Sequence, residues 1–229
     1  MDYERSLFGM KLTDAAALAR ELRKNQSLTS LTLTCNLLDD EKTRTLVLGL
    51  MENHTITSLD LSHNKIADRG VRALCKLLGE DSVISSVNLC DNHIHSEGGK
   101  FVGRALQINH SLLRMNLRLN RLGEKGGCYI FEGMKSNHSL TNLNLSSNGL
   151  EVEASRLFCG MAKLNSVLSE LDISSNGLGA EGGKSVHARS LACSRNGLLP
   201  ACLVALARCS GSFLSAECSS CKEPGFPAR

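Results

Sequence analysis

The 229-residue chain has a formal net charge of +3, and 42% of its residues are hydrophobic and 21% charged. This balance excludes a disordered chain, which would contain few apolar residues, and a protein made mainly of membrane-spanning segments. The lysines and arginines are spread along the sequence without forming a basic stripe, so we expect no nucleic-acid partner. No apolar run is long enough to cross a bilayer, so we expect no membrane partner.

The first stretch, residues 1–27, lacks the repeated pattern that follows it but contains apolar side chains at Tyr3, Phe8 and Met10. The segment from Thr13 to Lys24 has the spacing of a helix. The ends of a repeat array need a cover, because each unit buries its apolar face only against its neighbours. We therefore interpret residues 1–27 as an N-terminal partial or cap repeat.

Residues 28–187 repeat one pattern six times with a period of 28 residues. Each unit opens with L-x-x-L-x-L-x-x-N-x-L, which in the second unit runs from Ile56 to Ile66, and continues into apolar residues at helical spacing, such as Val71 to Leu78. The asparagine of the pattern recurs without a gap at Asn36, Asn64, Asn92, Asn120, Asn148 and Asn176. Such a period predicts six strand–helix units stacked side by side.

Each column of the repeat has its own physical role. Alternate strand residues point into the solenoid, and the asparagine amide can satisfy backbone groups where the chain turns off the strand, so we expect these asparagines to form a ladder. Acidic or hydroxyl residues are expected to complement their own helix starts at Asp40, Asp68, Ser96 and Glu124. Glycines follow two residues later and are expected to let helix and strand pack closely, at Gly70, Gly98, Gly126 and Gly182.

The predicted fold class is α/β: a leucine-rich-repeat solenoid, or horseshoe, with parallel strands on the concave face and helices on the convex face. The period of 28 residues resembles the leucine-rich repeats of the ribonuclease-inhibitor type, and this resemblance covers residues 28–187.

The tail, residues 188–229, does not continue the repeat. Pro200 falls inside the position of a seventh strand, where its missing N–H would break a ladder of hydrogen bonds. We expect a short capping helix at Leu198–Leu206 and disorder from Ser210 onward. Five cysteines lie singly in the repeats, at Cys35, Cys75, Cys90, Cys128 and Cys159. Because the first residues do not resemble a secretory signal, we expect these cysteines to be reduced and buried in an intracellular, cytoplasmic protein.

The outward residues of the predicted strands form a polar concave face without aromatic side chains. Protein interfaces rely on Trp, Tyr and Arg anchors, so Arg114 and Arg118 are the strongest candidates on this face. The complete set of candidate partner-binding residues is Asp60, Asn88, Arg114, Asn116, Arg118, Asn144, Glu170 and Asp172. A strand surface that is merely solvated remains the alternative.

No group of residues in the sequence indicates catalysis, a cofactor or a metal. His54, His110 and His138 share one column, but they follow the helix ends and are expected to be solvated loop histidines. Cys218 and Cys221 form a single C-x-x-C without the second pair that zinc sites contain. We therefore expect a non-enzymatic protein.

Four segments resemble the family of dynein regulatory complex subunit 5. They are E-R-S-L-F-G-M at Glu4–Met10, L-L-D-D-E-K-T-R at Leu37–Arg44, L-D-L-S-H-N-K-I-A-D-R-G at Leu59–Gly70 and M-N-L-R-L-N-R-L at Met115–Leu122. The resemblance implies a scaffold of the nexin link between axonemal doublets, located in the cytoskeleton of cilia and flagella. The implied partners are other subunits of the dynein regulatory complex, together with axonemal dynein or doublet microtubules.

A rival interpretation starts from a resemblance to the Ran-directed GTPase-activating proteins, which use the same repeat type. That resemblance implies a residue presented to the nucleotide site of a GTPase, and Arg69 is the loop arginine that it would nominate. A surface arginine at a helix start is the simpler interpretation of the same residue. The acidic tail typical of that family is missing here.

Overall fold

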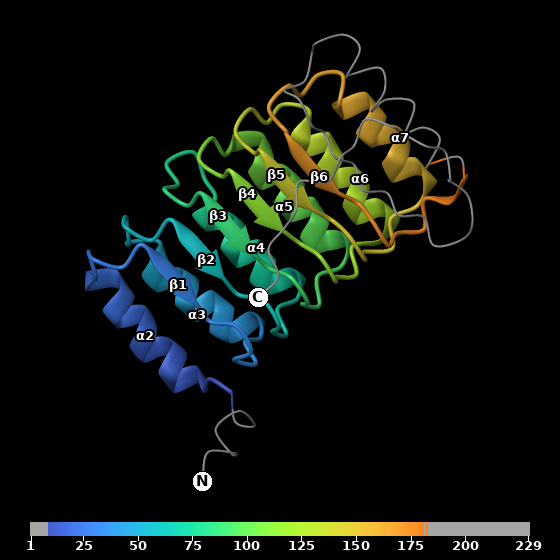
Figure 1. The fold of residues 1–229 in the computed structure, drawn as a ribbon. Helices are drawn as coiled ribbons and strands as arrows, with labels where there is room; N and C mark the ends of the chain where they lie inside the picture. Colours follow the sequence, from blue (N-terminus) through green and yellow to red (C-terminus); the bar gives the residue numbers. More distant parts are fainter. Residues whose placement is uncertain (1–8, 181, 183–229) are drawn as a thin grey trace, which may run out of the picture.

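Six strands and six helices alternate along a curved solenoid in the computed structural model, which describes residues 9–180 and residue 182. The strands are β1 Ser30–Thr32, β2 Ser58–Asp60, β3 Ser86–Asn88, β4 Arg114–Asn116, β5 Asn142–Asn144 and β6 Glu170–Asp172. The helices are α2 Leu12–Lys24, α3 Asp40–Leu50, α4 Asp68–Leu77, α5 Ser96–Ile108, α6 Gly123–Met134 and α7 Val152–Met161. Figure 1 shows the strands side by side in chain order, with the helices forming the opposite layer.

All neighbouring strands are parallel, and their register follows the sequence period: Ser30 lies opposite Ser58, which lies opposite Ser86. The middle residue of each strand points into a continuous apolar core, whereas the residues on either side of it face outward. The predicted fold class, an α/β leucine-rich-repeat solenoid with strands on one face and helices on the other, is confirmed.

The core is made of equivalent leucines and isoleucines from successive units. Ile56, Ile84 and Leu112 hold the same place in their repeats and are all buried. Leu28 holds this place in the first repeat but is 46% exposed, because β1 lies at the end of the described sheet and only one strand flanks it. Leu28 is therefore only partly covered, unlike its equivalents in the later repeats.

The strands end in a sharp turn at a left-handed residue. The residue before each repeat asparagine has a φ of 52–59°: Cys35, His63, Asp91, Leu119, Ser147 and Ser175. Such angles cost a non-glycine residue roughly 1–2 kcal/mol. The asparagine that follows offsets this cost by bonding to the surrounding backbone.

Asn64 shows how the predicted ladder is built. Its Nδ2 donates to the carbonyl oxygen of Leu33 in the preceding unit at 2.9 Å. Its Oδ1 accepts from the backbone N–H groups of Asn36 at 3.0 Å and Leu38 at 2.9 Å. Donation to the carbonyl of the preceding unit recurs at Asn92, Asn120, Asn148 and Asn176.

Asn148 is the incomplete rung of this ladder. Within the described residues, its buried Oδ1 accepts no hydrogen bond. By register, the N–H group that would reach it belongs to Leu122, but Leu122 already has helical angles there (φ −59°, ψ −35°). The neighbouring N–H of Gly123 donates to the main-chain carbonyl of Asn148 instead.

A second asparagine ladder lies where helices return to strands, in a column where the repeat favours asparagine after the helix end. Its buried members are Asn53, Asn109, Asn137 and Asn165. Asn137, for example, donates from Nδ2 to the carbonyls of Leu106 and Asn109 and accepts at Oδ1 from the N–H groups of Ser139 and Leu140. The second unit has the exposed Asp81 in this place, so the ladder is interrupted there.

The acidic side chains at the helix starts form their hydrogen bonds with the following repeat. Asp68, the first residue of α4, accepts at Oδ1 from the N–H groups of His95 and Gly98 at the start of α5. Glu124 likewise accepts from Glu151, Glu153 and Ala154 at the start of α7. The expectation that Asp68 and Glu124 bond to free N–H groups of their own helix is therefore corrected, although both lie in the first turn, where they complement the dipole as expected.

The column of glycines after these acids has a related purpose. A Cβ on Gly70 would lie 2.7 Å from Asp40 Oδ1, and one on Gly98 would lie 2.7 Å from Asp68 Oδ1. These glycines therefore make room for the carboxylate of the preceding helix. They also allow the close packing that the sequence had suggested, because a Cβ on Gly98 would lie 2.4 Å from Cγ2 of Ile94, between strand and helix.

The cysteines are less buried than expected. Cys90 is buried, but Cys75, Cys128 and Cys159 are half-buried on the helices, and Cys35 is exposed at a turn residue. Burial raises the pKa of the Cys75 thiol to about 12. The predicted tail, including Cys218, Cys221 and the capping helix, lies outside the described residues, as do residues 1–8 of the predicted cap.

Candidate protein-interaction site

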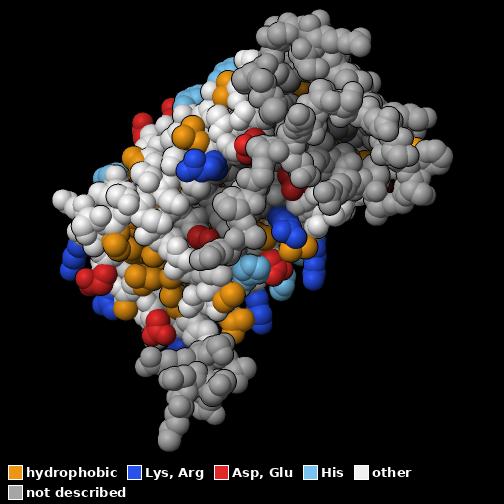
Figure 2. Space-filling view, in the orientation of Figure 1, with side chains coloured by type: hydrophobic (Ala, Val, Ile, Leu, Met, Phe, Trp, Pro, Cys, Tyr) orange, Lys and Arg blue, Asp and Glu red, His pale blue; other side chains and the backbone are white. Residues whose placement is uncertain are grey.

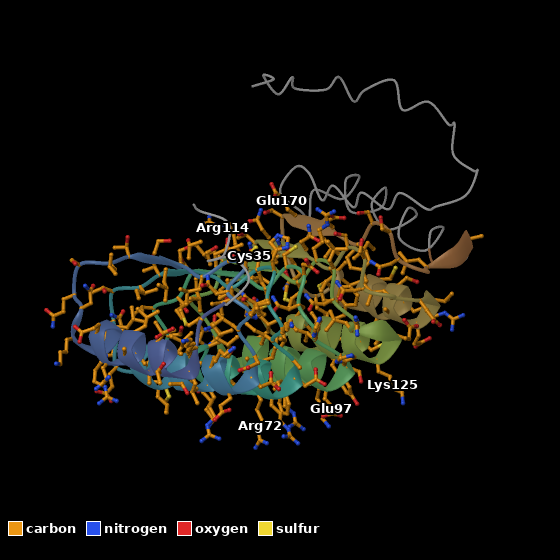
Figure 3. All side chains as sticks on the ribbon, turned by 90° about the horizontal axis from the view of Figure 1, so that it is seen from below. Cys35, Arg72, Glu97, Arg114, Lys125 and Glu170 are labelled. Carbon is orange, nitrogen blue, oxygen red and sulfur yellow. The ribbon has the colours of Figure 1, made fainter. Side chains whose placement is uncertain are left out.

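The concave face is built from the two outward residues of each strand and the second residue beyond the strand end. Because the strands pair in exact register, these residues form three rows across the sheet. Figure 3 shows Arg114 and Glu170 on the strand side of the molecule and Arg72, Glu97 and Lys125 on the helix side. In Figure 2, which views the strand side, the visible charged side chains are scattered, and groups of hydrophobic side chains lie between them.

The central part of this face is a hollow of about 510 Å³ over β3–β6. Six of the eight predicted partner-binding residues line it: Asn88, Arg114, Asn116, Asn144, Glu170 and Asp172. Asp60 and Arg118 are not among the lining residues. The structure therefore brings most of the predicted set together, although the residues come from four different repeats.

The carboxylates of the concave face accept hydrogen bonds from amides one repeat away. Asn88 Nδ2 donates to Asp60 Oδ2 at 3.0 Å, and Asn144 Nδ2 donates to Asp172 Oδ2 at 3.1 Å. Asn142, which sequence reasoning had not selected, donates to Glu170. A signal was present, because Asn142 and Glu170 lie one period apart in the same column.

Asp60 accepts more hydrogen bonds from the protein than the other carboxylates of this face. Burial alone would raise its pKa, but hydrogen bonds from Ser62, Asn88 and Thr34 outweigh burial and hold its pKa below the ordinary value of 3.8. Asp60 is therefore ionised at neutral pH and occupied by internal donors. Asp60 therefore adds negative potential to the concave face, but its oxygens are already bonded and offer a partner little direct contact.

Arg114 and Arg118 differ from these carboxylates because both are exposed, and neither forms an ion pair within the described residues. Arg114 is the first residue of β4 and Arg118 lies two residues beyond the end of that strand, in the same repeat. Asn116 lies between them, and its Oδ1 accepts from the N–H of Arg118 at 3.0 Å. Two unpaired guanidinium groups in the fourth repeat are thus available to carboxylates of a partner.

The other predicted candidates lie apart from this face. His54, His110 and His138 are exposed in loops. Arg69 is the second residue of α4, on the helix side, and so does not lie in a loop. Within the described residues no group of histidines, cysteines and acids could hold a metal ion, and no helix could span a membrane.

One sequence expectation about charge is wrong. Lysines and arginines that are scattered in the sequence do gather in space, on the helix layer. Every fully exposed residue of α4 is a cation: Arg69, Arg72 and Lys76. The sequence concealed this patch because its members recur at intervals of one repeat and come from different helices.

Comparisons with known proteins support the same architecture. The family model described as Leucine Rich repeat matches residues 52–75, 136–154 and 164–186. Dynein regulatory complex subunit 5 of Chlamydomonas reinhardtii is 59% identical over 44 residues, which are 19% of this chain and 11% of that protein. The chain thus matches only a small part of that relative's length.

Two solved structures share the fold. Leiomodin-1 Actin-Binding Site 2 has a TM-score of 0.56 at 18% identity and covers 82% of this chain and 99% of its own. The tropomodulin C-terminal domain of Caenorhabditis elegans has a TM-score of 0.53 at 17% identity and covers 80% of this chain and 99% of its own. At these identities the similarity shows the solenoid fold.

Proposed function

We propose that this leucine-rich-repeat protein is a non-enzymatic scaffold of the axonemal nexin–dynein regulatory complex, in which it helps to regulate dynein-driven movement of cilia and flagella. The observation that carries the proposal is the 59% identity, over 44 residues, to dynein regulatory complex subunit 5 of Chlamydomonas reinhardtii. Leucine-rich-repeat solenoids present an extended surface to other proteins, which agrees with a role in holding subunits together.

The concave face is the surface through which this scaffold binds its partner. Arg114 and Arg118 are the anchors, since they are exposed and unpaired within the described residues, while Asn116 lies between them. The carboxylates Asp60 and Asp172 already have internal donors and frame the site. The partner that fits is another subunit of the complex with carboxylates spaced to meet both arginines.

The test is the retention of a tagged chain in axonemes isolated from motile cilia. The tagged protein is expected to remain with the axonemes through a high-salt wash and to co-purify with other subunits of the dynein regulatory complex. A protein found only in the soluble cytosol would overturn the proposal.

A charge-reversal variant locates the binding face. Arg114→Glu/Arg118→Glu is expected to lose retention while keeping the circular dichroism spectrum of the native protein. The matched control is Arg20→Glu/Lys24→Glu, which makes the same change of charge on exposed residues of α2. Equal loss in both variants would remove the concave face from the proposal.

A further inference from the structure

The helix layer carries a cluster of positive charge on three adjacent helices. We define the convex basic patch as Arg44 on α3, Arg69, Arg72 and Lys76 on α4, and Lys100 and Arg104 on α5. Arg44, Arg72 and Lys100 occupy the same place in successive repeats and form one row. Lys76 and Arg104 form a second row, one helical turn further along.

Three acids border this charge. Glu41 and Glu97 hold the place of Arg69 in the two neighbouring repeats, and Glu132 on α6 follows Lys76 and Arg104 in their row. Glu97 pairs with Lys100 at 3.5 Å. Asp68 is turned away from the patch, because its Oδ1 is bonded to N–H groups at the start of α5. Within the described residues, the other five cations of the patch form no ion pair.

Aromatic rings hold two of these cations in place. The guanidinium carbon of Arg72 lies 5.6 Å from the centroid of Phe101, and Lys100 Nζ lies 5.9 Å from the centroid of Tyr129. A guanidinium that rests on a ring keeps its N–H groups directed outward and loses less side-chain entropy when it binds a carboxylate. The patch is therefore partly arranged for binding before any partner arrives.

We propose that the convex basic patch is a second docking surface, on the face opposite the concave site, and that it takes an acidic segment of a partner protein. The positive charge of the patch is complementary to a run of aspartates and glutamates. Its arginines can each form two parallel hydrogen bonds with a carboxylate. The net charge of +3 is low for a nucleic-acid ligand, which favours a partner with a shorter run of negative charge.

A second docking face adds to the proposed scaffold function, and the inference rests on that function for its biological setting. The concave face holds one subunit by its arginines, and the convex patch holds an acidic segment of another. A solenoid with both faces occupied joins two proteins without any change in its own shape.

The test uses a fluorescein-labelled synthetic peptide of about twenty residues, mostly glutamate, titrated into the purified full chain at low salt. The native protein is expected to bind it. Arg72→Glu/Arg104→Glu is expected to weaken binding by at least about tenfold, because like charges then face each other. The control Arg20→Glu/Lys24→Glu has the same net charge and is expected to stay within about twofold of the native protein.

A second variant tests the arrangement of the patch without changing its charge. Phe101→Leu removes the ring under Arg72 and is expected to weaken peptide binding by about threefold, in line with an exposed cation–π contact. Thermal unfolding of each variant establishes that it is folded at the temperature of the titration. Native affinity in Phe101→Leu would overturn the proposed role of the ring.

Three results would overturn the docking surface itself. They are no binding of the peptide by the native protein, equal weakening in the control, and tighter binding of a single-stranded DNA of equal length through the same residues. The last would indicate a polyphosphate ligand. Because axonemal retention is measured separately, failure of the titration leaves the proposed scaffold function standing.

Discussion

At the scale of single residues, hydrogen-bonding capacity decides what each repeat asparagine contributes. Asn64 satisfies two backbone N–H groups and also donates to the carbonyls of Leu33, Leu61 and Ser62. Asn148 is equally buried but its Oδ1 is unpaired within the described residues. Asparagines in the same column of the repeat therefore contribute unequally to the free energy of folding.

Alanine substitution at the two positions should reveal this difference. Asn64→Ala leaves more buried backbone groups unpaired, and each costs about 1–3 kcal/mol, so the free energy of unfolding should fall by about 3 kcal/mol or more. Asn148→Ala should cost at least about 1 kcal/mol less, because no acceptor is lost at Oδ1. Urea denaturation followed by circular dichroism measures both, and equal losses would contradict the ladder described here.

At the scale of elements, the contact that joins helices is a carboxylate reaching from one helix start to the next. Asp68 of α4 bonds to the start of α5, and Gly98 makes room for it. The residue type was predictable, because acids favour helix starts. The hydrogen-bond partner of Asp68 was not predictable. Its side chain can reach either its own helix or the next one, and only the packed structure shows which of the two it contacts.

Hydrogen exchange distinguishes the two possibilities. Asp68→Ala should speed amide exchange at His95 and Gly98, whose N–H groups lose their acceptor, and should lower stability by about 1 kcal/mol, as expected for a lost cap. Amides in the first turn of α4 itself should be unchanged. Faster exchange confined to α4 would show that Asp68 serves its own helix after all.

At the scale of the whole molecule, the array depends on how closely adjacent helices approach. A Cβ added to Gly103 of α5 would lie 2.2 Å from the carbonyl oxygen of Tyr129, and one added to Gly133 of α6 would lie 2.1 Å from that of Gly103. These two helices therefore meet backbone to backbone. Since each repeat is stabilised only by its neighbours, this contact couples the two halves of the solenoid.

Gly103→Ala should separate α5 from α6 and weaken that coupling. We expect a fall in stability of about 1–3 kcal/mol, as for overpacked interiors, together with a broader unfolding transition as the two halves lose cooperativity. The control is Gly160→Ala on α7, where an added Cβ meets nothing within 4 Å. That change should stabilise the helix by up to about 1 kcal/mol. Differential scanning calorimetry compares the two, and similar transitions would contradict the coupling.

The sequence by itself determined the fold, because one unbroken period of 28 residues allows each apolar column to be buried only by stacking. It also placed Arg114 and Arg118 on the outward side of the fourth repeat's strand segment, since side chains alternate along an extended chain. Tertiary structure alone decided which helix Asp68 serves and that Arg72 and Arg104 share a patch. Those relations join residues about one repeat apart on neighbouring helices, where the distance between the helices, and not the local pattern, fixes what touches.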